Sequence, residues 1–245
     1  KKQKLLLTNK RVDRGFKQSV QAAQLRIEKQ MEQEHKQVLL VSSTLPQEGK
    51  SMTAVNLALA FMQHEKKTVL IDGDLRKPSV AEMLGMEEQK GLAEYLKGNA
   101  KVKEVLQKKG DLTVIQGGKV HGNISSLMDE SRMEELMTFL KSEFDYVIID
   151  TPPAYLFSDA AILAGYADRV LYVVRHDMAE IPQIEKGMES FIQEDKLLGY
   201  LINRSQKGFA SYGKYGYGKY GYGKYGKYQR YVDVKEDDMD TEDSL

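Results

Sequence analysis

The most informative segment of this 245-residue chain reads Thr44-Leu45-Pro46-Gln47-Glu48-Gly49-Lys50-Ser51. It follows an apolar run at 38–42 that predicts a buried strand, and it precedes a run with helical spacing at 52–63. A strand-to-helix loop that ends in Gly-Lys-Ser is typical of a phosphate-binding P-loop. Backbone N–H groups of the loop can face the phosphates, Lys50 can bridge the β and γ groups, and the Ser51 hydroxyl can bind Mg²⁺.

Two loop residues depart from the usual pattern GxxxxGK[ST]. Thr44 stands where the first glycine is expected, and Gln47 follows Pro46 where another glycine would ease a tight turn. The strand-to-helix context still favours a nucleotide site. The residues expected to contact the nucleotide here are Thr44, Gln47, Glu48, Gly49, Lys50, Ser51 and Met52.

Short apolar runs and helix-type runs alternate along the chain, which predicts a P-loop NTPase-like α/β fold with a mostly parallel sheet and helices on both faces. The predicted strands are 38–42, 68–71, 112–115, 146–149, 170–174 and 198–202, and the predicted helices are 14–34, 52–63, 125–141, 159–167 and 181–194. We expect one catalytic domain at 14–206, a basic flank at 1–13 and a flexible tail at 207–245.

Acidic residues follow two further predicted strands. Asp72, Asp74 and Arg76 come after the run at 68–71, and Asp150 comes after the run at 146–149. The carboxyl ends of parallel strands form the ligand crevice of an open α/β sheet, so we expect these residues to meet the P-loop.

The chemistry of phosphoryl transfer assigns roles to these residues. Lys50 and a Mg²⁺ held by Ser51 and Asp150 would neutralise phosphate charge, and Asp72 or Asp74 would orient the acceptor hydroxyl or take its proton. The sequence does not separate those two carboxylates. Asn203, which ends the last predicted strand, could contact the adenine edge or simply form a turn.

The C-terminal segment is a tyrosine-rich repeat. The unit Tyr-Gly-Lys-Tyr-Gly occurs three times between Tyr212 and Gly226, and eight of the 14 tyrosines fall between Tyr212 and Tyr231. Frequent glycine predicts a flexible segment. Such a segment is either a cationic aromatic arm for nucleic acid or a cluster of phosphate acceptors, and the P-loop on the same chain favours the second interpretation.

Composition excludes several other classes of protein. The chain has no cysteine, so disulfides and thiolate metal sites are excluded, and its four histidines lack a metal-binding spacing. No run approaches the roughly 18 apolar residues of a membrane span. The basic residues at 1–11 are typical either of the cytoplasmic flank of a membrane helix or of a solvated terminus.

Together the three strand-end motifs, Asp150-Thr-Pro-Pro153 and the tyrosine cluster resemble the cytoplasmic kinase domain of bacterial tyrosine kinases from capsular and exopolysaccharide systems. The resemblance implies an ATP- and Mg²⁺-dependent tyrosine autokinase. It implies catalytic roles for Lys50, Asp72, Asp74 and Asp150, metal binding by Ser51, Asp74 and Asp150, and nucleotide contacts from Arg76 and Asn203. The implied phosphate acceptors are Tyr212, Tyr215, Tyr217, Tyr220, Tyr222, Tyr225, Tyr228 and Tyr231.

The resemblance also implies partners. These are a transmembrane activator of the polysaccharide co-polymerase type, as a separate chain or an N-terminal module, and a cognate phosphotyrosine phosphatase, at the inner face of the cell membrane; nucleic acid is not expected. Related kinases form rings through Glu-x-x-Arg-x-x-Arg on their first helix. The matching place here holds Gln18, Gln21 and Gln24, which lack the charges for such ion pairs.

Two alternative functions remain open at the level of sequence. One is a partition-type ATPase that uses its nucleotide state to switch dimerisation, although that class carries a signature lysine where this chain has Leu45. The other is a non-catalytic scaffold that binds nucleotide and presents the tyrosine arm.

Overall fold

The computed structural model describes residues 5–120 and 131–204, which all lie in the compact unit Lys1–Gln206. The helices are α1 (Arg14–Gln33), α2 (Lys50–Gln63), α3 (Val80–Leu84), α4 (Leu92–Leu96), α5 (Val102–Val105), α7 (Ser131–Glu143), α8 (Asp159–Ala164) and α9 (Ile181–Gln193). The strands are β1 (Val38–Ser43), β2 (Thr68–Asp72), β3 (Gln107–Lys109), β4 (Leu112–Ile115), β5 (Tyr146–Asp150), β6 (Arg169–Arg175) and β7 (Leu197–Asn203). The predicted tail and its eight acceptor tyrosines lie outside the described residues.

The strands form one sheet in the order β3-β4-β2-β5-β1-β6-β7. Every neighbouring pair is parallel except β3 and β4 at one edge. The mostly parallel sheet is therefore confirmed. Because β2, β5 and β1 are adjacent, the loops that follow them leave the sheet side by side.

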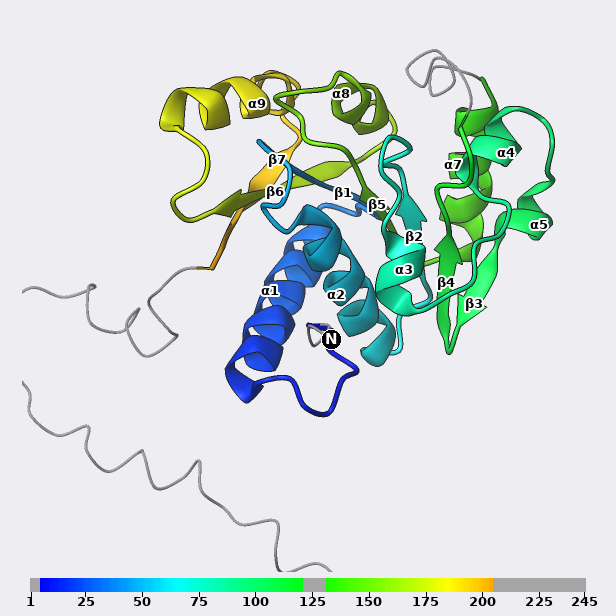
Figure 1. Ribbon diagram of the computed structural model, residues 1–245, viewed down its shortest axis with the longest axis horizontal. Helices are drawn as coiled ribbons and strands as arrows, with labels where there is room; N and C mark the ends of the chain where they lie inside the picture. The colour runs from blue at the N-terminus through cyan, green and yellow to red at the C-terminus, as the bar shows by residue number, and fades with distance from the viewer. Residues whose placement is uncertain (1–4, 121–130, 205–245) are drawn as a thin grey trace, which may run out of the picture. The chain divides into compact units, whose positions relative to one another are not determined.

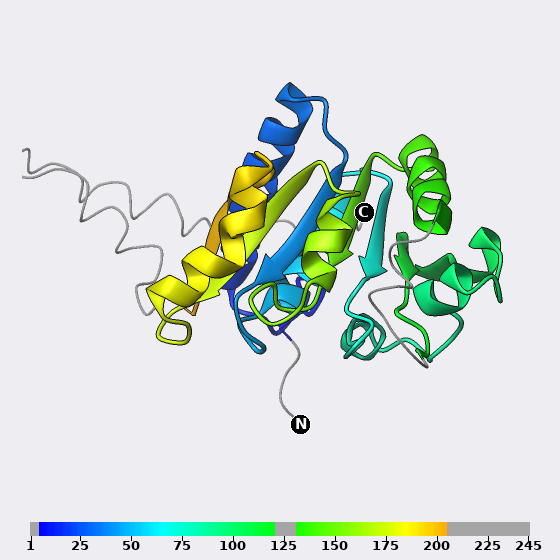
Figure 2. The same cartoon turned by 90° about the horizontal axis from the view of Figure 1, so that it is seen from above.

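Helices cover both faces of the sheet, as predicted (Figures 1 and 2). Side chains of a strand point alternately to its two faces. In β1, Val38 and Leu40 pack into the core under α7, α8 and α9, whereas Leu39 and Val41 pack into the core under α1 and α2. Strands buried on both faces are nearly continuous apolar runs, which is why they were recognisable in the sequence.

The shortest elements of the fold were not predicted from the sequence. Helices α3, α4 and α5 have only four or five residues each, too few to show a helical period. Strand β3 reads Gln-Lys-Lys and joins the sheet by antiparallel pairing with β4. Helix α7 is described from Ser131 to Glu143, so the start of the predicted helix at 125–130 lies outside the described residues.

The segment before α1 packs against the fold. Leu7 and Val12 are buried. The Leu7 N–H donates to Oδ1 of Asn56 on α2 (2.7 Å), and Nδ2 of Asn56 donates to the carbonyl of Leu5 (2.9 Å). Asp13 then caps α1 by accepting from the Phe16 N–H. None of the described helices is long and apolar enough to cross a membrane.

The three glutamines of α1 that replace the charged residues of the ring-forming motif differ in burial. Gln18 and Gln21 are exposed, but Gln24 is fully buried and donates to the carboxylate of Glu28. Glu28 in turn pairs with Lys66 (3.1 Å). Gln24 therefore belongs to the packing of α1, and only Gln18 and Gln21 are accessible to another subunit.

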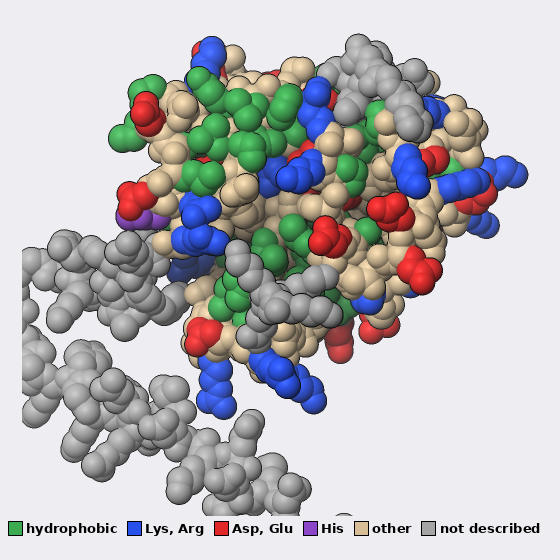
Figure 3. Space-filling view, in the orientation of Figure 1, with side chains coloured by type: hydrophobic (Ala, Val, Ile, Leu, Met, Phe, Trp, Pro, Cys, Tyr) green, Lys and Arg blue, Asp and Glu red, His purple; other side chains and the backbone are tan. Residues whose placement is uncertain are grey.

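Apolar side chains gather on the face over α8 and α9 in Figure 3. The exposed ones include Tyr155 and Leu156 in the loop after β5, and Ile181 and Ile192 on α9.

Candidate functional site

The P-loop joins β1 to α2 in a backbone conformation that favours glycine at two positions. Gly49, the N-cap of α2, has φ 100°, and a side chain there would put its Cβ 2.1 Å from Nδ2 of Asn203. Gln47 has φ 67°, in the left-handed region. Gly49 is therefore required, whereas Gln47 occupies a strained position that the usual P-loop gives to glycine.

Groups from β6 and β7 hold this loop in place. The buried Glu48 carboxylate accepts the N–H groups of Leu45 (2.6 Å) and Arg175 (3.3 Å). Arg175 Nη1 donates to the carbonyl of Gln47 (3.2 Å), and Asn203 Nδ2 donates to the carbonyl of Glu48 (2.8 Å). The side chains of Glu48 and Asn203 thus brace the loop, and an adenine contact from Asn203 stays a prediction.

Arg175 is a site residue that the sequence analysis missed. The sequence signal for Arg175 was its place at the end of a predicted buried strand, the criterion that selected Asp72 and Asp150.

Thr44, which replaces the first glycine of the usual P-loop, contacts a residue of β6. It is fully buried, and its Oγ1 accepts from the hydroxyl of Tyr172 (3.1 Å). Thr44 therefore anchors the loop to the sheet through its side chain.

Replacing Gln47 by glycine is expected to stabilise the nucleotide-free protein by about 0.5–1 kcal/mol. Relief of the left-handed strain contributes about 1–2 kcal/mol, and the greater freedom of glycine in the unfolded chain offsets part of that gain. Thermal unfolding of Gln47→Gly and Gln47→Ala would measure it. Alanine keeps the Cβ and the strain, so equal stabilisation by both variants would contradict the backbone explanation.

Charged groups from the three strand ends converge beside the P-loop. Lys50, the first residue of α2, forms an ion pair of 3.0 Å with Asp74 in the loop after β2. Asp72 and Asp150 end β2 and β5 and are partners in the parallel register. Asp72 and Asp150 are fully buried, so the site places three carboxylates around one ammonium group.

Burial and mutual repulsion alter the acidity of these groups. Burial raises the pKa of Asp150 to about 8, against the opposing Lys50 charge and with help from the charge of Asp72. Burial also raises the pKa of Asp72 to about 6, although the N–H groups of Val80 and Ser79 oppose the rise. Burial acts to lower the pKa of Lys50, but the negative charges of Asp150 and Asp74 outweigh that effect, so the pKa of Lys50 is raised overall. Lys50 therefore stays charged.

The two candidate acceptor carboxylates differ in their partners. Asp74 uses Oδ2 for Lys50 and accepts the Lys77 N–H (3.1 Å) at Oδ1. Asp72 uses Oδ2 for the N–H groups of Ser79 (2.8 Å) and Val80 (3.0 Å), and its Oδ1 is buried without a partner among the described residues. Of these two carboxylates, Asp72 is the one that has an oxygen atom without a hydrogen-bond partner among the described residues.

The site suits a magnesium ion that arrives with phosphates. Both carboxylate oxygens of Asp150 are buried and neither has a close hydrogen-bond partner in the described part of the chain, although the neighbouring Ser51 hydroxyl acts to lower the pKa of Asp150. Within residues 5–120 and 131–204, no group of three or more acidic, His or Cys side chains is arranged to hold a metal alone. Mg²⁺ usually binds through one or two carboxylates plus substrate phosphates and water, so Asp150 and the Ser51 hydroxyl match that requirement.

Arg76, a predicted nucleotide contact, lies against the loop after β5. Its guanidinium forms a bidentate pair with the buried Asp159 at the start of α8 (2.9–3.2 Å) and stacks over the ring of Phe157 at 4.3 Å. Arg76 thereby ties the β2 and β5 loops together. A contact with nucleotide stays a prediction.

Comparison with known proteins matches the fold of this chain. The family model "ParA: NUBPL iron-transfer P-loop NTPase" matches residues 34–164. The kinase domain of the Escherichia coli tyrosine kinase ETK superimposes with a TM-score of 0.72 at 27% identity, covering 84% of this chain and 80% of that one.

Curated relatives extend the match over most of the described chain. "Tyrosine-protein kinase CpsD" of Streptococcus agalactiae is 35% identical over 183 residues, which are 73% of this chain and 80% of the relative. "Tyrosine-protein kinase YwqD" of Bacillus subtilis is 35% identical over 182 residues, 73% of this chain and 77% of the relative.

Proposed function

The chain belongs to the bacterial tyrosine-protein kinase family, and from that membership we propose that it transfers the γ-phosphate of ATP to tyrosine hydroxyls, including those of its own tail, in capsular or exopolysaccharide synthesis. The observation that carries the proposal is the convergence of the Lys50–Asp74 pair with the unpartnered carboxylates of Asp72 and Asp150 at the P-loop. The repeat of tyrosines after Asn203 supplies acceptors on the same chain.

The residues of the site act mainly by positioning and by charge. The loop 44–51 and the N-terminus of α2 present N–H groups to the phosphates, and Lys50 places a positive charge on the β and γ groups. Ser51 and Asp150, with Asp74 beside them, would hold Mg²⁺, which would supply positive charge to neutralise the phosphates. The phenol oxygen bonds to the γ-phosphorus as the bond to ADP breaks.

Asp72 is the proposed proton acceptor for the phenol. Its Oδ1 is the atom without a partner, and its pKa of about 6 lies near the pH of the reaction, where a general base works best. Asp74 is less suited to be the base, since its oxygens already accept hydrogen bonds from Lys50 and the Lys77 N–H, and it is proposed as metal support instead. The tyrosine proton passes to Asp72 and then to solvent.

Regulation is proposed to follow the rest of the family resemblance. A transmembrane activator at the inner face of the membrane would stimulate the kinase, a cognate phosphatase would reverse it, and subunits would exchange tails. An interface at α1 would use the exposed Gln18 and Gln21 through hydrogen bonds instead of ion pairs.

A phosphotyrosine map of the full chain tests the proposal. After incubation with Mg-ATP and the activator, we expect mass spectrometry to find phosphate on several residues between Tyr212 and Tyr231. Steady ATP hydrolysis with an unmodified tail and unmodified added tyrosine peptides would instead indicate a partition-type ATPase. Nucleotide binding with neither activity would indicate the scaffold.

A further inference from the structure

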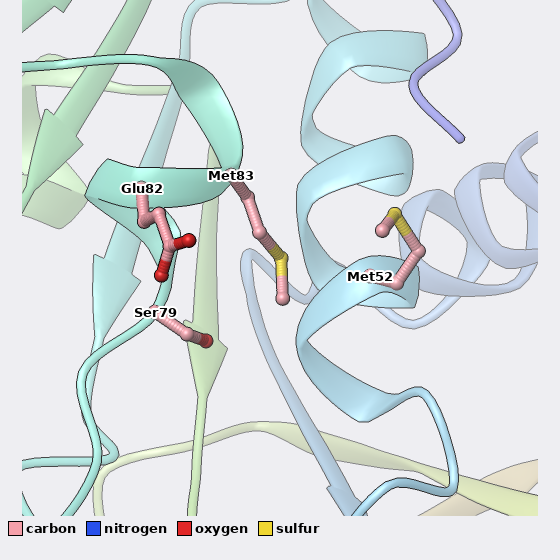
Figure 4. Close-up of a pocket in the computed structure, with 4 residues that line it drawn as sticks. All are labelled: Met52, Ser79, Glu82 and Met83. Carbon is pink, nitrogen blue, oxygen red and sulfur yellow. The ribbon is translucent and has the colours of Figure 1, made fainter. Parts of the chain in front are cut away.

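A hollow of about 150 Å³ lies between α3 and the first turn of α2. Its lining is Met52 on α2, Ser79 at the N-cap of α3, and Glu82 and Met83 on α3. In Figure 4, Met83 projects from α3 into the space in front of Met52, and the side chains of Ser79 and Glu82 border the same space. The lining thus holds one thioether from each helix and the polar side chains of Ser79 and Glu82.

The hollow adjoins the phosphoryl-transfer site through both of its walls. Ser79 donates its N–H to Asp72 Oδ2 (2.8 Å), so the α3 wall begins at the proposed base. Met52 follows Ser51 directly, so the α2 wall begins at the proposed metal ligand. The hollow is thus linked to the proposed base by the Ser79–Asp72 hydrogen bond and to the proposed metal ligand by the chain neighbour Met52.

The dimensions and lining suit an aromatic ring. A cavity of about 150 Å³ holds a benzene molecule, and methionine sulfur makes favourable contacts with aromatic rings. Resting on the proposed kinase function, we propose that this hollow binds the phenol ring of the acceptor tyrosine between Met52 and Met83. The ring would point its hydroxyl toward Asp72.

The negative charge of Glu82 is complementary to the basic residues of the tail sequence. Its side chain is exposed at the border of the hollow. Each of the eight tail tyrosines has a lysine or arginine within two positions, as in Tyr212-Gly213-Lys214 and Arg230-Tyr231. A negative group beside the ring site therefore favours acceptors flanked by basic residues, whether they come from the same chain or from a second copy.

A larger side chain in the hollow tests whether the hollow binds the tyrosine ring, which we call the ring site. Met83→Trp in the full chain is expected to raise KM for a Tyr-Gly-Lys peptide about tenfold or more, while affinity for Mg-ADP and hydrolysis of ATP without acceptor stay within about twofold. Met62→Trp is the matched control, because Met62 lies near the opposite end of α2. Equal loss of nucleotide affinity in Met83→Trp, or an unchanged peptide KM, would overturn the proposal.

A charge exchange tests the role of Glu82. Glu82→Lys is expected to lower kcat/KM for the Tyr-Gly-Lys peptide about tenfold and to raise it for a Tyr-Gly-Glu peptide. A loss of the same size for both peptides would show that Glu82 does not select the acceptor. Mixing wild-type chain with isotope-labelled Lys50→Met chain would show by mass spectrometry whether acceptors come from the same or a second copy.

A binding measurement separates this inference from the proposed function. In full-length protein with ¹³C-methyl methionine, titration with N-acetyl-tyrosinamide is expected to shift the methyl signals of Met52 and Met83 but not that of Met62. If wild-type protein phosphorylates no tyrosine, the kinase proposal fails, and these shifts alone decide whether the hollow binds phenols. Absence of the shifts would overturn the ring site even in an active kinase.

Discussion

Replacing Lys50 by methionine is expected to reduce tyrosine phosphorylation at least about 10³-fold. Lys50 is the cation of the P-loop, and its side chain is largely buried, so water replaces its charge poorly. Methionine has a similar length and fills the same space. The loss would be measured as the initial rate of phosphotyrosine formation on the tail and on an added peptide.

Lys97→Met is the matched control for that experiment, since Lys97 is exposed at the end of α4. The control variant is expected to keep the wild-type rate within about twofold. Circular dichroism should show that Lys50→Met remains folded. A folded Lys50→Met protein that still phosphorylates tyrosine at a tenth of the wild-type rate or more would contradict the assignment of Lys50.

Asp150→Asn is expected to lower the phosphorylation rate about 10²–10³-fold and, at the same time, to stabilise the nucleotide-free protein at pH 8. The first effect follows from the loss of a charged Mg²⁺ ligand. The second follows because a buried carboxylate without a hydrogen-bond partner costs free energy when it ionises, whereas an amide carries no charge.

The sign of the pH dependence follows from the raised pKa of Asp150. Its pKa is about 8 in the folded protein against 3.8 for a free carboxyl, so the folded state binds the proton more tightly. The corresponding stability is complete below about pH 4 and is lost as the pH rises through 8. The pKa of Asp72, raised to about 6, adds a loss of the same sign at lower pH.

Thermal unfolding between pH 5 and pH 9 would check this prediction. Without nucleotide, Tm of Asp150→Asn at pH 8 should exceed that of wild type by about 3 °C or more, and the difference should shrink toward pH 5. Asp111→Asn, a change of an exposed carboxylate, should show no such difference. A wild-type Tm that rises from pH 6 to pH 8 relative to Asp150→Asn would contradict the raised pKa of Asp150.

With Mg-ADP bound, the wild-type protein should be more stable than Asp150→Asn. Asp150 would hold the metal in its ionised form, so binding would release its proton, and nucleotide should stabilise the wild-type protein more at pH 8 than at pH 6. Asp150→Asn should gain less from Mg-ADP at either pH. An equal gain in both proteins would exclude Asp150 as a metal ligand.

Local patterns in the sequence were sufficient to predict the architecture of the fold. The buried strands read as apolar runs because both of their faces are covered, and the Gly-Lys-Ser loop marks the junction of β1 and α2. The carboxylates were found because the ends of parallel strands share one edge of a sheet. Elements of three to five residues such as β3 and α3 were not predicted, since they are too short to show a helical or strand period in their apolar residues.

The partners of each side chain were not predictable in this way, because they come from distant parts of the chain. The sequence alone determined the class of fold, the P-loop and the carboxylates around it. Packing in three dimensions was needed to show that Glu48 and Asn203 brace the loop, that Gln24 is buried, and that the Asp74 oxygens accept hydrogen bonds while one oxygen of Asp72 has no partner among the described residues. Residue type and spacing fix which groups are present, whereas burial and hydrogen-bond partners, which set their charge and availability, exist only once the chain is packed.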